Sequence, residues 1–329
     1  MFFSAGCMKF SITVFSLGKM KVLYSKISRD WEAIQNRQER AILEQYNKEG
    51  LWLSKLYMAF VFMTWIVCSS KPFLPLVVNL IIPSENGTRP LLTPLHADYI
   101  FFDQTEHIYL ISAYTAAAYT FFFPFFSGFE SFYLLTVKHV CGLFAVTCYR
   151  IETSLNILKE KEVGVKPLCS IYARTKCQKN LIDIVILHND AIRSVELLED
   201  SFNICFLAII LMSTTGLAIS TTFIIYASDE LLSLTEILFL QTGITLYLFS
   251  VSWVGQQLTD SSEQIFYSAY STNWYTTNPK ICCYLHIIMM RSYSPSKLTG
   301  GKLLDLSMVT FGMIIRKAVS YFTVFLSLT

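Results

Sequence analysis

The sequence predicts an all-α protein, a polytopic bundle of transmembrane helices. Of its 329 residues, 53% are hydrophobic and only 15% are charged, whereas soluble domains carry about 25% charged residues. The charges gather in 19–55, 150–200 and 280–317 and leave long stretches between them almost uncharged. Long apolar runs separated by charged loops are typical of a membrane protein with several spans. The net charge of +2 gives no basis for nucleic-acid binding.

Apolar runs that suit a membrane span, which takes about 20 residues, occur at about six places along the chain. The first, residues 2–18, is short and contains Lys9. A signal peptide would carry positive charge ahead of its apolar run, and this segment carries none. We expect it to be the inner part of a membrane helix that continues as a polar helix through Glu32. The other runs are 54–82, 108–148, 202–227, 231–258 and a weaker one at 306–328.

The basic residues predict how these spans are oriented. Lysine and arginine are frequent in 19–50 and in 150–200, whereas 83–107 contains a single arginine. Because cytoplasmic loops carry the excess of Lys and Arg, we expect the first two stretches inside the cell and 83–107 outside. The sequon at Asn86 agrees with an outside loop and makes Asn86 a candidate glycosylation site.

The polar stretch 259–300 is expected on the cytoplasmic side, after the 231–258 span. Apolar residues recur at helical spacing in 262–291, which predicts a helix there. Thr259, Asp260 and Glu263 would open that helix, with Thr259 or Asp260 as its cap. The final span then crosses outward, so the N-terminus is expected in the cytoplasm and the C-terminus outside.

The last third of the chain contains several short pieces in one order. They are Thr259-Asp260-Ser261-Ser262-Glu263-Gln264-Ile265, Ala269-Tyr270, Trp274-Tyr275, Gly300-Gly301-Lys302, Asp305-Leu306, Phe311 and the ending SYFTVFLSL at 320–328. In order and spacing they resemble the region before the last helix, and the terminal pore helix, of insect odorant receptors. A looser likeness covers the rest of the chain, including Arg29-Asp30-Trp31-Glu32 after an inner helix.

This resemblance implies a seven-helix fold with cytoplasmic anchor helices. About six spans are visible, so the first helix, its following loop and the outer half of the second are expected to be absent. We expect a single transmembrane domain over 1–329. Within it, 1–258 would form the ligand-binding bundle, 259–300 the anchor helix region and 301–329 the terminal pore helix.

The resemblance also implies a function, which is that of a subunit of a ligand-gated cation channel. Such a subunit binds small volatile molecules, assembles with an olfactory co-receptor into a heterotetramer, and lies among lipids in the plasma membrane of olfactory sensory neurons. No enzyme activity, cofactor or metal site is expected. The nine cysteines include no Cys-x-x-Cys pair and have no histidine at metal-ligand spacing.

Aromatic residues crowd 109–133, where they either face lipid and pack or line a pocket for odorants. A volatile ligand gains affinity mainly from apolar contact, with one or two placed polar groups. The expected topology puts six candidates in the outer half of the bundle, and the resemblance suggests their ligand-binding role: Trp65, Tyr109, Ser112, Tyr119, Phe239 and Thr242.

The terminal span carries the candidate pore residues. Val324 and Ser327 are three residues apart and therefore share a helical face, which serves either packing or conduction. The resemblance places Val324 at a hydrophobic constriction and Ser327 just outside it. Arg316 and Lys317 lie inside the same span and would either snorkel toward the cytoplasm or line the inner pore.

Three alternatives fit the sequence less well. A gustatory receptor of the same superfamily usually has a Gln-Phe pair in its last helix, and 320–328 has none. A G-protein-coupled receptor would carry an Asp-Arg-Tyr-like triplet, but Cys148-Tyr149-Arg150 has the wrong order. It would also carry an Asn-Pro-x-x-Tyr motif in a final helix, but Asn278-Pro279 has Cys282 where that motif has tyrosine. A membrane enzyme or transporter would show paired intramembrane carboxylates or an inverted repeat, and neither is present.

Overall fold

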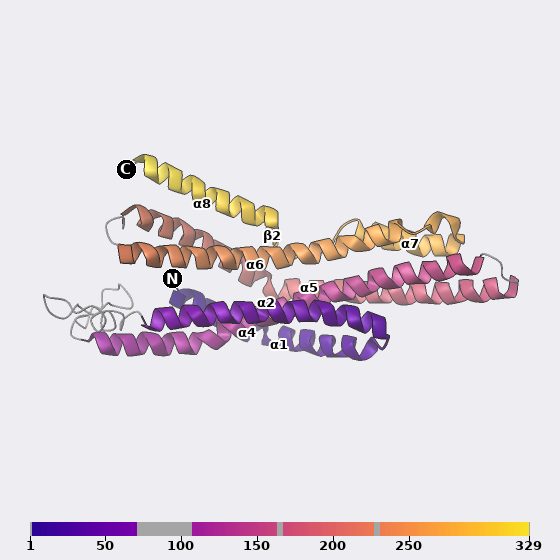
Figure 1. The fold of residues 1–329 in the computed structure, drawn as a ribbon, viewed down its shortest axis with the longest axis horizontal. Coiled ribbons are helices and arrows are strands. Elements are labelled where there is room, and N and C mark those ends of the chain that lie inside the picture. Colours follow the sequence, from indigo (N-terminus) through magenta and orange to yellow (C-terminus); the bar gives the residue numbers. More distant parts are fainter. Residues whose placement is uncertain (1, 71–106, 163–166, 227–230, 329) are drawn as a thin grey trace. The chain divides into compact units, whose positions relative to one another are not determined.

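The computed structural model describes residues 2–70, 107–162, 167–226 and 231–328, and in these ranges the chain is almost entirely helical (Figure 1). This confirms the all-α fold class. In chain order the elements are α1 (Phe2–Ala33), α2 (Arg37–Ser70), α4 (Ile108–Glu162), α5 (Pro167–Tyr226), α6 (Leu231–Tyr270), the 3-10 turn η2 (Trp274–Thr276), α7 (Pro279–Ser292), β1 (Thr299–Gly300), β2 (Leu304–Asp305) and α8 (Met308–Leu328).

Four of the helices in the described ranges are long and apolar enough to cross a membrane: Arg37–Val67, Ile108–Leu155, Thr175–Thr221 and Ile237–Tyr270. They overlap the four stronger runs expected from the sequence, although 71–82 lies outside the described residues. The helices extend beyond those runs. At 1.5 Å per residue, the 55 residues of α4 reach far past a hydrocarbon core of about 30 Å. Polar residues therefore continue the same helices outside the apolar stretch.

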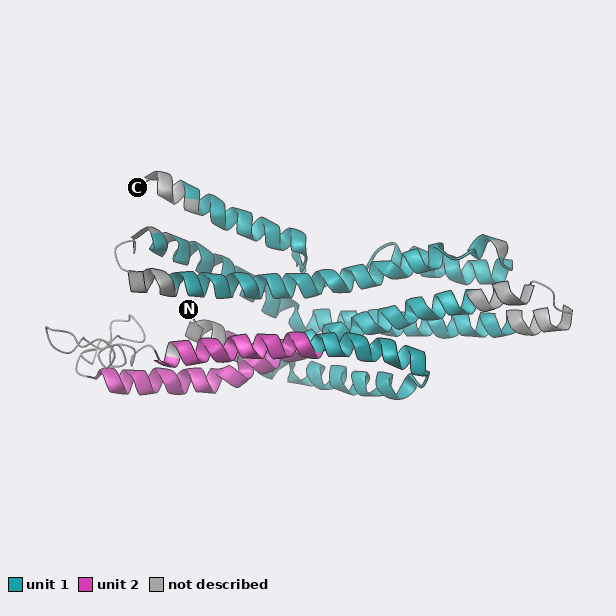
Figure 2. Cartoon of the chain, in the orientation of Figure 1, with its two compact units in different colours: residues 1, 14–50, 134–329 teal, residues 2–13, 51–133 magenta. Residues whose placement is uncertain are grey.

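The chain divides into two compact units, drawn in teal and magenta in Figure 2. Unit 1 contains Val14–Gly50 and Leu134–Thr329, and unit 2 contains Phe2–Thr13 and Leu51–Tyr133. Helices α1, α2 and α4 each pass from one unit into the other. The segment expected as an inner membrane helix with a polar extension is one continuous helix, α1, as predicted.

Unit 1 is built around α5, which contacts α6, α7, β1 and α8. Its core is aromatic and aliphatic, and the largest fully buried side chains include Phe144, Phe202 and Phe206. Phe202 and Phe206 are four residues apart on α5 and stack with ring centroids 5.9 Å apart. Side chains at this spacing share one helical face, so this face of α5 forms part of the core.

Unit 2 packs the first turns of α1 against α4. A buried ion pair lies within it, with Lys9 Nζ 2.6 Å from Glu130 Oε1. Nearby, the rings of Phe10 and Phe125 meet edge to face, with centroids 4.9 Å apart. Lys9 interrupts the first apolar run of the sequence, and the structure pairs its charge with the carboxylate of Glu130, 121 residues further along the chain.

The prediction of one helix over 262–291 is wrong. Helix α6 runs without a break from Leu231 to Tyr270, and α7 begins only at Pro279. Thr259 lies inside α6, where its hydroxyl donates to the Gly255 carbonyl, and it caps nothing. The true cap is Asn278, whose side chain accepts from the Lys280 N–H. Proline suits the first turn of a helix and disrupts its interior, and α7 begins at Pro279. The helical spacing of apolar residues does not show this boundary.

Candidate functional site

A short β-hairpin links the anchor region to α8 and is fixed to α5. The hairpin pairs Thr299 with Asp305 and Gly300 with Leu304. The carboxylate of Glu199 on α5 accepts hydrogen bonds from both the backbone N–H (2.8 Å) and the hydroxyl of Thr299. Hydrogen bonds to an ionised carboxylate are stronger than neutral ones. The start of the hairpin is therefore held in a fixed position against α5.

The glycines of the hairpin allow it to approach α5 closely. Gly301 has φ of +63°, a backbone conformation that residues with a side chain rarely adopt. Its N–H donates to the Asn203 carbonyl at 2.8 Å. A Cβ at Gly301 would lie 2.4 Å from Leu207 Cδ2. The Gly-Gly pair in the sequence therefore serves both the turn and the contact with α5.

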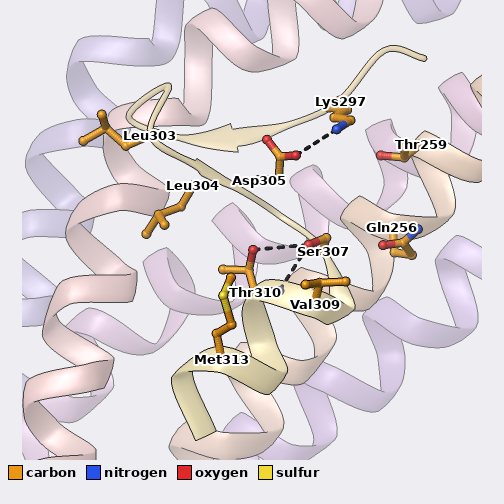
Figure 3. A pocket seen from close by; sticks show the side chains of 10 residues that line it. All are labelled: Gln256, Thr259, Lys297, Leu303, Leu304, Asp305, Ser307, Val309, Thr310 and Met313. Atoms are coloured by element: carbon orange, nitrogen blue, oxygen red, sulfur yellow. Dashed lines mark hydrogen bonds and ion pairs between the residues drawn. The ribbon is translucent and has the colours of Figure 1, made fainter. Parts of the chain in front are cut away.

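A hollow of about 510 Å³ lies between α6, the hairpin and the first turns of α8 (Figure 3). On its rim, Lys297 Nζ and Asp305 Oδ2 form an exposed ion pair at 2.9 Å. Ser307 caps α8, because its hydroxyl oxygen accepts from the Thr310 N–H at 3.2 Å. The lining mixes polar groups with apolar ones, including Leu304, Val309 and Met313.

Among the side chains of α8 that the structure describes, one face is buried within this chain. Thr310, Ile314 and Ala318, spaced four apart, are buried, whereas Val309 and Val319 are 71% and 56% exposed. Arg316 and Lys317 are exposed as well. The candidate pore residues Val324 and Ser327 fall within the helical span of α8, but their side chains lie outside the described part of the structure.

In unit 2, Trp65 on α2 lies beside the turn of α4 that carries Tyr119. The indole Nε1–H of Trp65 donates to the hydroxyl of Thr120 at 3.2 Å. Phe62 stacks on Trp65, with ring centroids 5.6 Å apart, and also meets Phe123 of α4. An aromatic cluster with one hydroxyl thus joins α2 to α4, and two of the candidate ligand residues belong to it or adjoin it.

The other two candidates on α4 differ from each other in exposure. Ser112 is buried, and its hydroxyl donates to the Ile108 carbonyl one turn earlier at 2.6 Å. Tyr109 is 61% exposed and Tyr119 is half-buried. The 10 residues between Tyr109 and Tyr119 correspond to about 15 Å along a helix. The four candidates of unit 2 therefore extend along one stretch of α2 and α4.

The remaining candidates lie elsewhere. Phe239 and Thr242 are exposed on one turn of α6 in unit 1, and the Thr242 hydroxyl donates to the Leu238 carbonyl. Asn86, the candidate glycosylation site, is outside the described residues. No finding tests these assignments, and they stay predictions.

Comparison with known proteins identifies the family. A profile of the family described as "7tm Odorant receptor" matches residues 1–319, nearly the whole chain. The chain belongs to this odorant receptor family. The resemblance expected from the C-terminal pieces of the sequence is therefore confirmed.

Curated relatives and solved structures agree with this assignment. The receptor is 26% identical to Odorant receptor 33b of Drosophila melanogaster over 52% of its own chain and 44% of that relative. It is 23% identical to Odorant receptor 9a of the same species, over 86% of this chain and 67% of that relative. The olfactory receptor OR5 of Machilis hrabei matches with a TM-score of 0.71 at 16% identity, over 99% of this chain and 78% of that one. A second structure of OR5, in complex with eugenol, matches with a TM-score of 0.65 over 99% of this chain and 82% of that one. At this identity the structural match concerns the fold.

A second hollow in the receptor, of about 270 Å³, is lined almost entirely by aromatic and methionine side chains at the ends of α6 and α7. Phe266 and Tyr270 come from α6, Trp274 from η2, and Met290 from α7. Tyr270 and Met290 are 61% and 71% exposed. This hollow lies within the stretch expected to be cytoplasmic anchor.

Sequence reasoning missed two charged side chains, one half-buried and one buried, that join helices or the hairpin within unit 1. One is Glu199, which receives the hairpin. The other is Lys138 on α4, which is 3% exposed and lies 2.8 Å from Glu49 of α2. An isolated lysine in an apolar helix is a detectable signal, because a charge at membrane depth needs a partner. Its partners, however, are not adjacent in sequence.

Proposed function

We propose that this odorant receptor is the odorant-binding subunit of a ligand-gated cation channel that assembles with a co-receptor into a heterotetramer. Its ligands are small volatile molecules. It works in the plasma membrane of olfactory sensory neurons, with its N-terminus in the cytoplasm and its C-terminus outside. Family membership supports the sensory role, and the arrangement of α8 carries the proposal of a channel.

The exposed faces of α8 carry the channel proposal. Of the α8 side chains that the structure describes, one stripe packs against its own chain, whereas Arg316, Lys317 and Tyr321 are exposed. Charged side chains at membrane depth usually face protein or a water-filled cavity. A helix with one packed stripe, whose exposed side chains include both apolar and charged groups, suits the wall of a central pore, where neighbouring subunits and water cover those faces.

The partner proposal has separate support in the aromatic hollow of α6, η2 and α7. Large exposed aromatic and methionine side chains are enriched at the centres of protein–protein interfaces. The hollow lies in the region that the positive-inside rule places in the cytoplasm. Tyr270, Met290 and Tyr293 are therefore proposed to contact a co-receptor subunit.

The ligand proposal rests on the aromatic cluster of unit 2. Phe62, Trp65 and Phe123 offer apolar ring surface, and Thr120 and Tyr119 offer hydroxyl groups nearby. This combination suits a small apolar molecule with one polar group. The solved receptor OR5 holds eugenol, a small organic molecule, which supports a ligand of that size.

The first experiment is to express the chain with and without a co-receptor in a non-neuronal cell and record currents during exposure to a panel of volatiles. A volatile that evokes a fast cation current only when both chains are present supports the proposal. A current from this chain alone would contradict the co-receptor requirement. A slow response that disappears when G proteins are blocked would contradict the channel mechanism.

The ligand residues are tested in the same cells. Tyr109→Ala, Ser112→Ala and Tyr119→Ala should each shift the odorant concentration for half-maximal response, and leave currents evoked by a co-receptor agonist intact. Tyr114→Ala is a matched control, because Tyr114 is also exposed on α4 and is not a candidate. Unchanged odorant responses in all three variants would remove this assignment.

The pore residues are tested by selectivity. Val324→Asn and Ser327→Glu should change permeability ratios, block or basal leak modestly, because a mixed tetramer takes only part of its pore lining from this chain. Ligand preference should stay the same. Val22→Asn, at an exposed valine of α1, is the matched control. Wild-type conduction in both pore variants at normal surface levels would contradict the pore assignment.

A further inference from the structure

The buried lysine of α4 is held by side chains from two other helices. Lys138 Nζ lies 2.8 Å from Glu49 Oε2 on α2. The same ammonium group lies 5.9 Å from the ring centroid of Tyr46 and 5.6 Å from that of Trp253 on α6. A cation within about 6 Å of an aromatic ring is attracted by the negative face of the ring. One charge therefore links α2, α4 and α6 inside unit 1.

This lysine lies close in sequence or in space to the points where α2 and α4 pass between the two units. Helix α2 belongs to unit 1 up to Gly50, and α4 belongs to it from Leu134 onward. A Cβ at Gly50 would lie 3.1 Å from the Cβ of Lys138, so the two helices are in close contact there. Glu49 thus lies just before the point where α2 passes into unit 2, and Lys138 lies just after the point where α4 leaves unit 2, the unit that carries four of the candidate ligand residues.

On α6, the turn that receives Lys138 also supports the start of α8. Gly255, two residues after Trp253, packs on Leu306, and a Cβ at Gly255 would lie only 2.4 Å from the Leu306 carbonyl oxygen. The Leu306 N–H donates to the Leu298 carbonyl at 2.8 Å. Helix α8 begins two residues later. Movement of this part of α6 must therefore move the base of α8 or break this contact.

From these contacts we propose that Lys138 is a positioning residue that couples odorant binding to α8 through Trp253 and Gly255. This inference rests on the proposed function. Displacement of α2 and α4 on ligand binding carries the ammonium with it. Trp253 follows, because the buried ammonium group would otherwise lose its attraction to the face of the indole ring. The Gly255–Leu306 contact then passes the displacement to the base of α8.

The experiment compares Lys138→Met, Trp253→Leu and the double variant in the full chain with its co-receptor. Each single variant should lower the maximal odorant-evoked current per surface receptor by roughly fivefold or more, the lower end of typical coupling between sites. The current evoked by a co-receptor agonist should stay unchanged. The double variant should lose no more than the larger single loss, because both changes break the same contact.

Two control sets separate coupling from folding. Lys48→Met and Trp52→Leu change the same residue types at exposed positions of α2 and should leave the maximal current unchanged. Trp253→Phe keeps an aromatic ring for the ammonium and should restore most of the response lost in Trp253→Leu. If Lys138→Met fails to reach the surface, the comparison of Trp253→Phe with Trp253→Leu decides the question.

Three results would overturn the proposal. The first is a wild-type maximal current in both single variants at normal surface levels. The second is a double variant whose loss equals the product of the two single losses, because the residues would then act independently. The third is equal loss in Trp253→Phe and Trp253→Leu. In each case the wild-type chain still responds to odorant, so the proposed function stands. If the wild-type chain does not respond, both the proposed function and the coupling role of Lys138 are contradicted.

Discussion

Arg150 on α4 holds Glu39 on α2 through two parallel hydrogen bonds. The distances are 3.0 Å from Nε to Oε1 and 2.7 Å from Nη2 to Oε2. The two side chains are 26% and 9% exposed, so water screens this pair only in part. The arrangement is the two-pronged match of a guanidinium with a carboxylate, which a lysine cannot reproduce.

We predict that Arg150→Ala destabilises the receptor by about 1–3 kcal/mol, because it leaves the carboxylate of Glu39 largely buried without its cation. Thermal unfolding in detergent and surface expression measure the loss. Arg193→Ala is the control, since Arg193 and Asp190 are exposed and 3.9 Å apart, and its effect should stay within about 0.5 kcal/mol. Equal stability of the two variants would mean that the Arg150 pair contributes nothing.

The ion pair of unit 2 should be more sensitive, because both side chains are almost fully buried, at 6% and 2% exposure. Lys9→Met leaves Glu130 as a buried charge without its ammonium partner and should cost about 3–5 kcal/mol. The double variant Lys9→Met/Glu130→Leu removes both charges and should regain most of that loss. The same detergent melting assay applies, and a double variant as unstable as Lys9→Met would refute this account.

Two glycines should respond to alanine in opposite directions. Gly255→Ala forces a Cβ to within 2.4 Å of the Leu306 carbonyl oxygen, which cannot move without shifting the backbone, and should cost about 2 kcal/mol or more. Gly312 on α8 has nothing within 4 Å of its Cβ position. Gly312→Ala should therefore stabilise the helix slightly, by up to about 1 kcal/mol. Similar melting temperatures for both variants would contradict the close contact at Gly255.

The hairpin should depend on one carboxylate of α5. Glu199→Ala removes the acceptor for the backbone N–H and hydroxyl of Thr299 and should cost about 1–3 kcal/mol. Protease cleavage near residues 297–305 should become faster as the hairpin loosens. Glu196→Ala is the matched control, because Glu196 is exposed one turn earlier on the same helix. Unchanged cleavage in Glu199→Ala would show that other contacts hold the hairpin.

The topology prediction places 83–107 and the C-terminus outside the cell. An epitope tag after Thr329 should be stained on intact cells, and a glycosidase that removes N-linked sugars should lower the apparent mass of the chain. Asn86→Gln should abolish that mass shift. Staining of the tag only after permeabilisation would reverse the orientation derived from the basic residues.

The sequence by itself determined the fold class, the approximate positions of the main spans and the family. Each depends on local composition or on short pieces in order along the chain, and a run of about 20 apolar residues has few alternatives to a helix in a membrane. The helix break before Pro279 was also readable from the sequence. There apolar residues keep a helical spacing on both sides of the proline, so spacing alone does not show the boundary that the proline marks.

Only the tertiary structure decided which distant residues meet. Lys138 and Glu49 are 89 positions apart, Lys9 and Glu130 are 121 apart, and Thr299 finds Glu199 across 100 residues. Hydropathy and periodicity describe each segment by itself and carry no information on which helices lie side by side. The partners of a buried charge depend on how helices cross, which is set by the packing of many side chains together. For that reason the sequence could have marked Lys138 as an isolated charge in an apolar helix, but not its link to Trp253 and the base of α8.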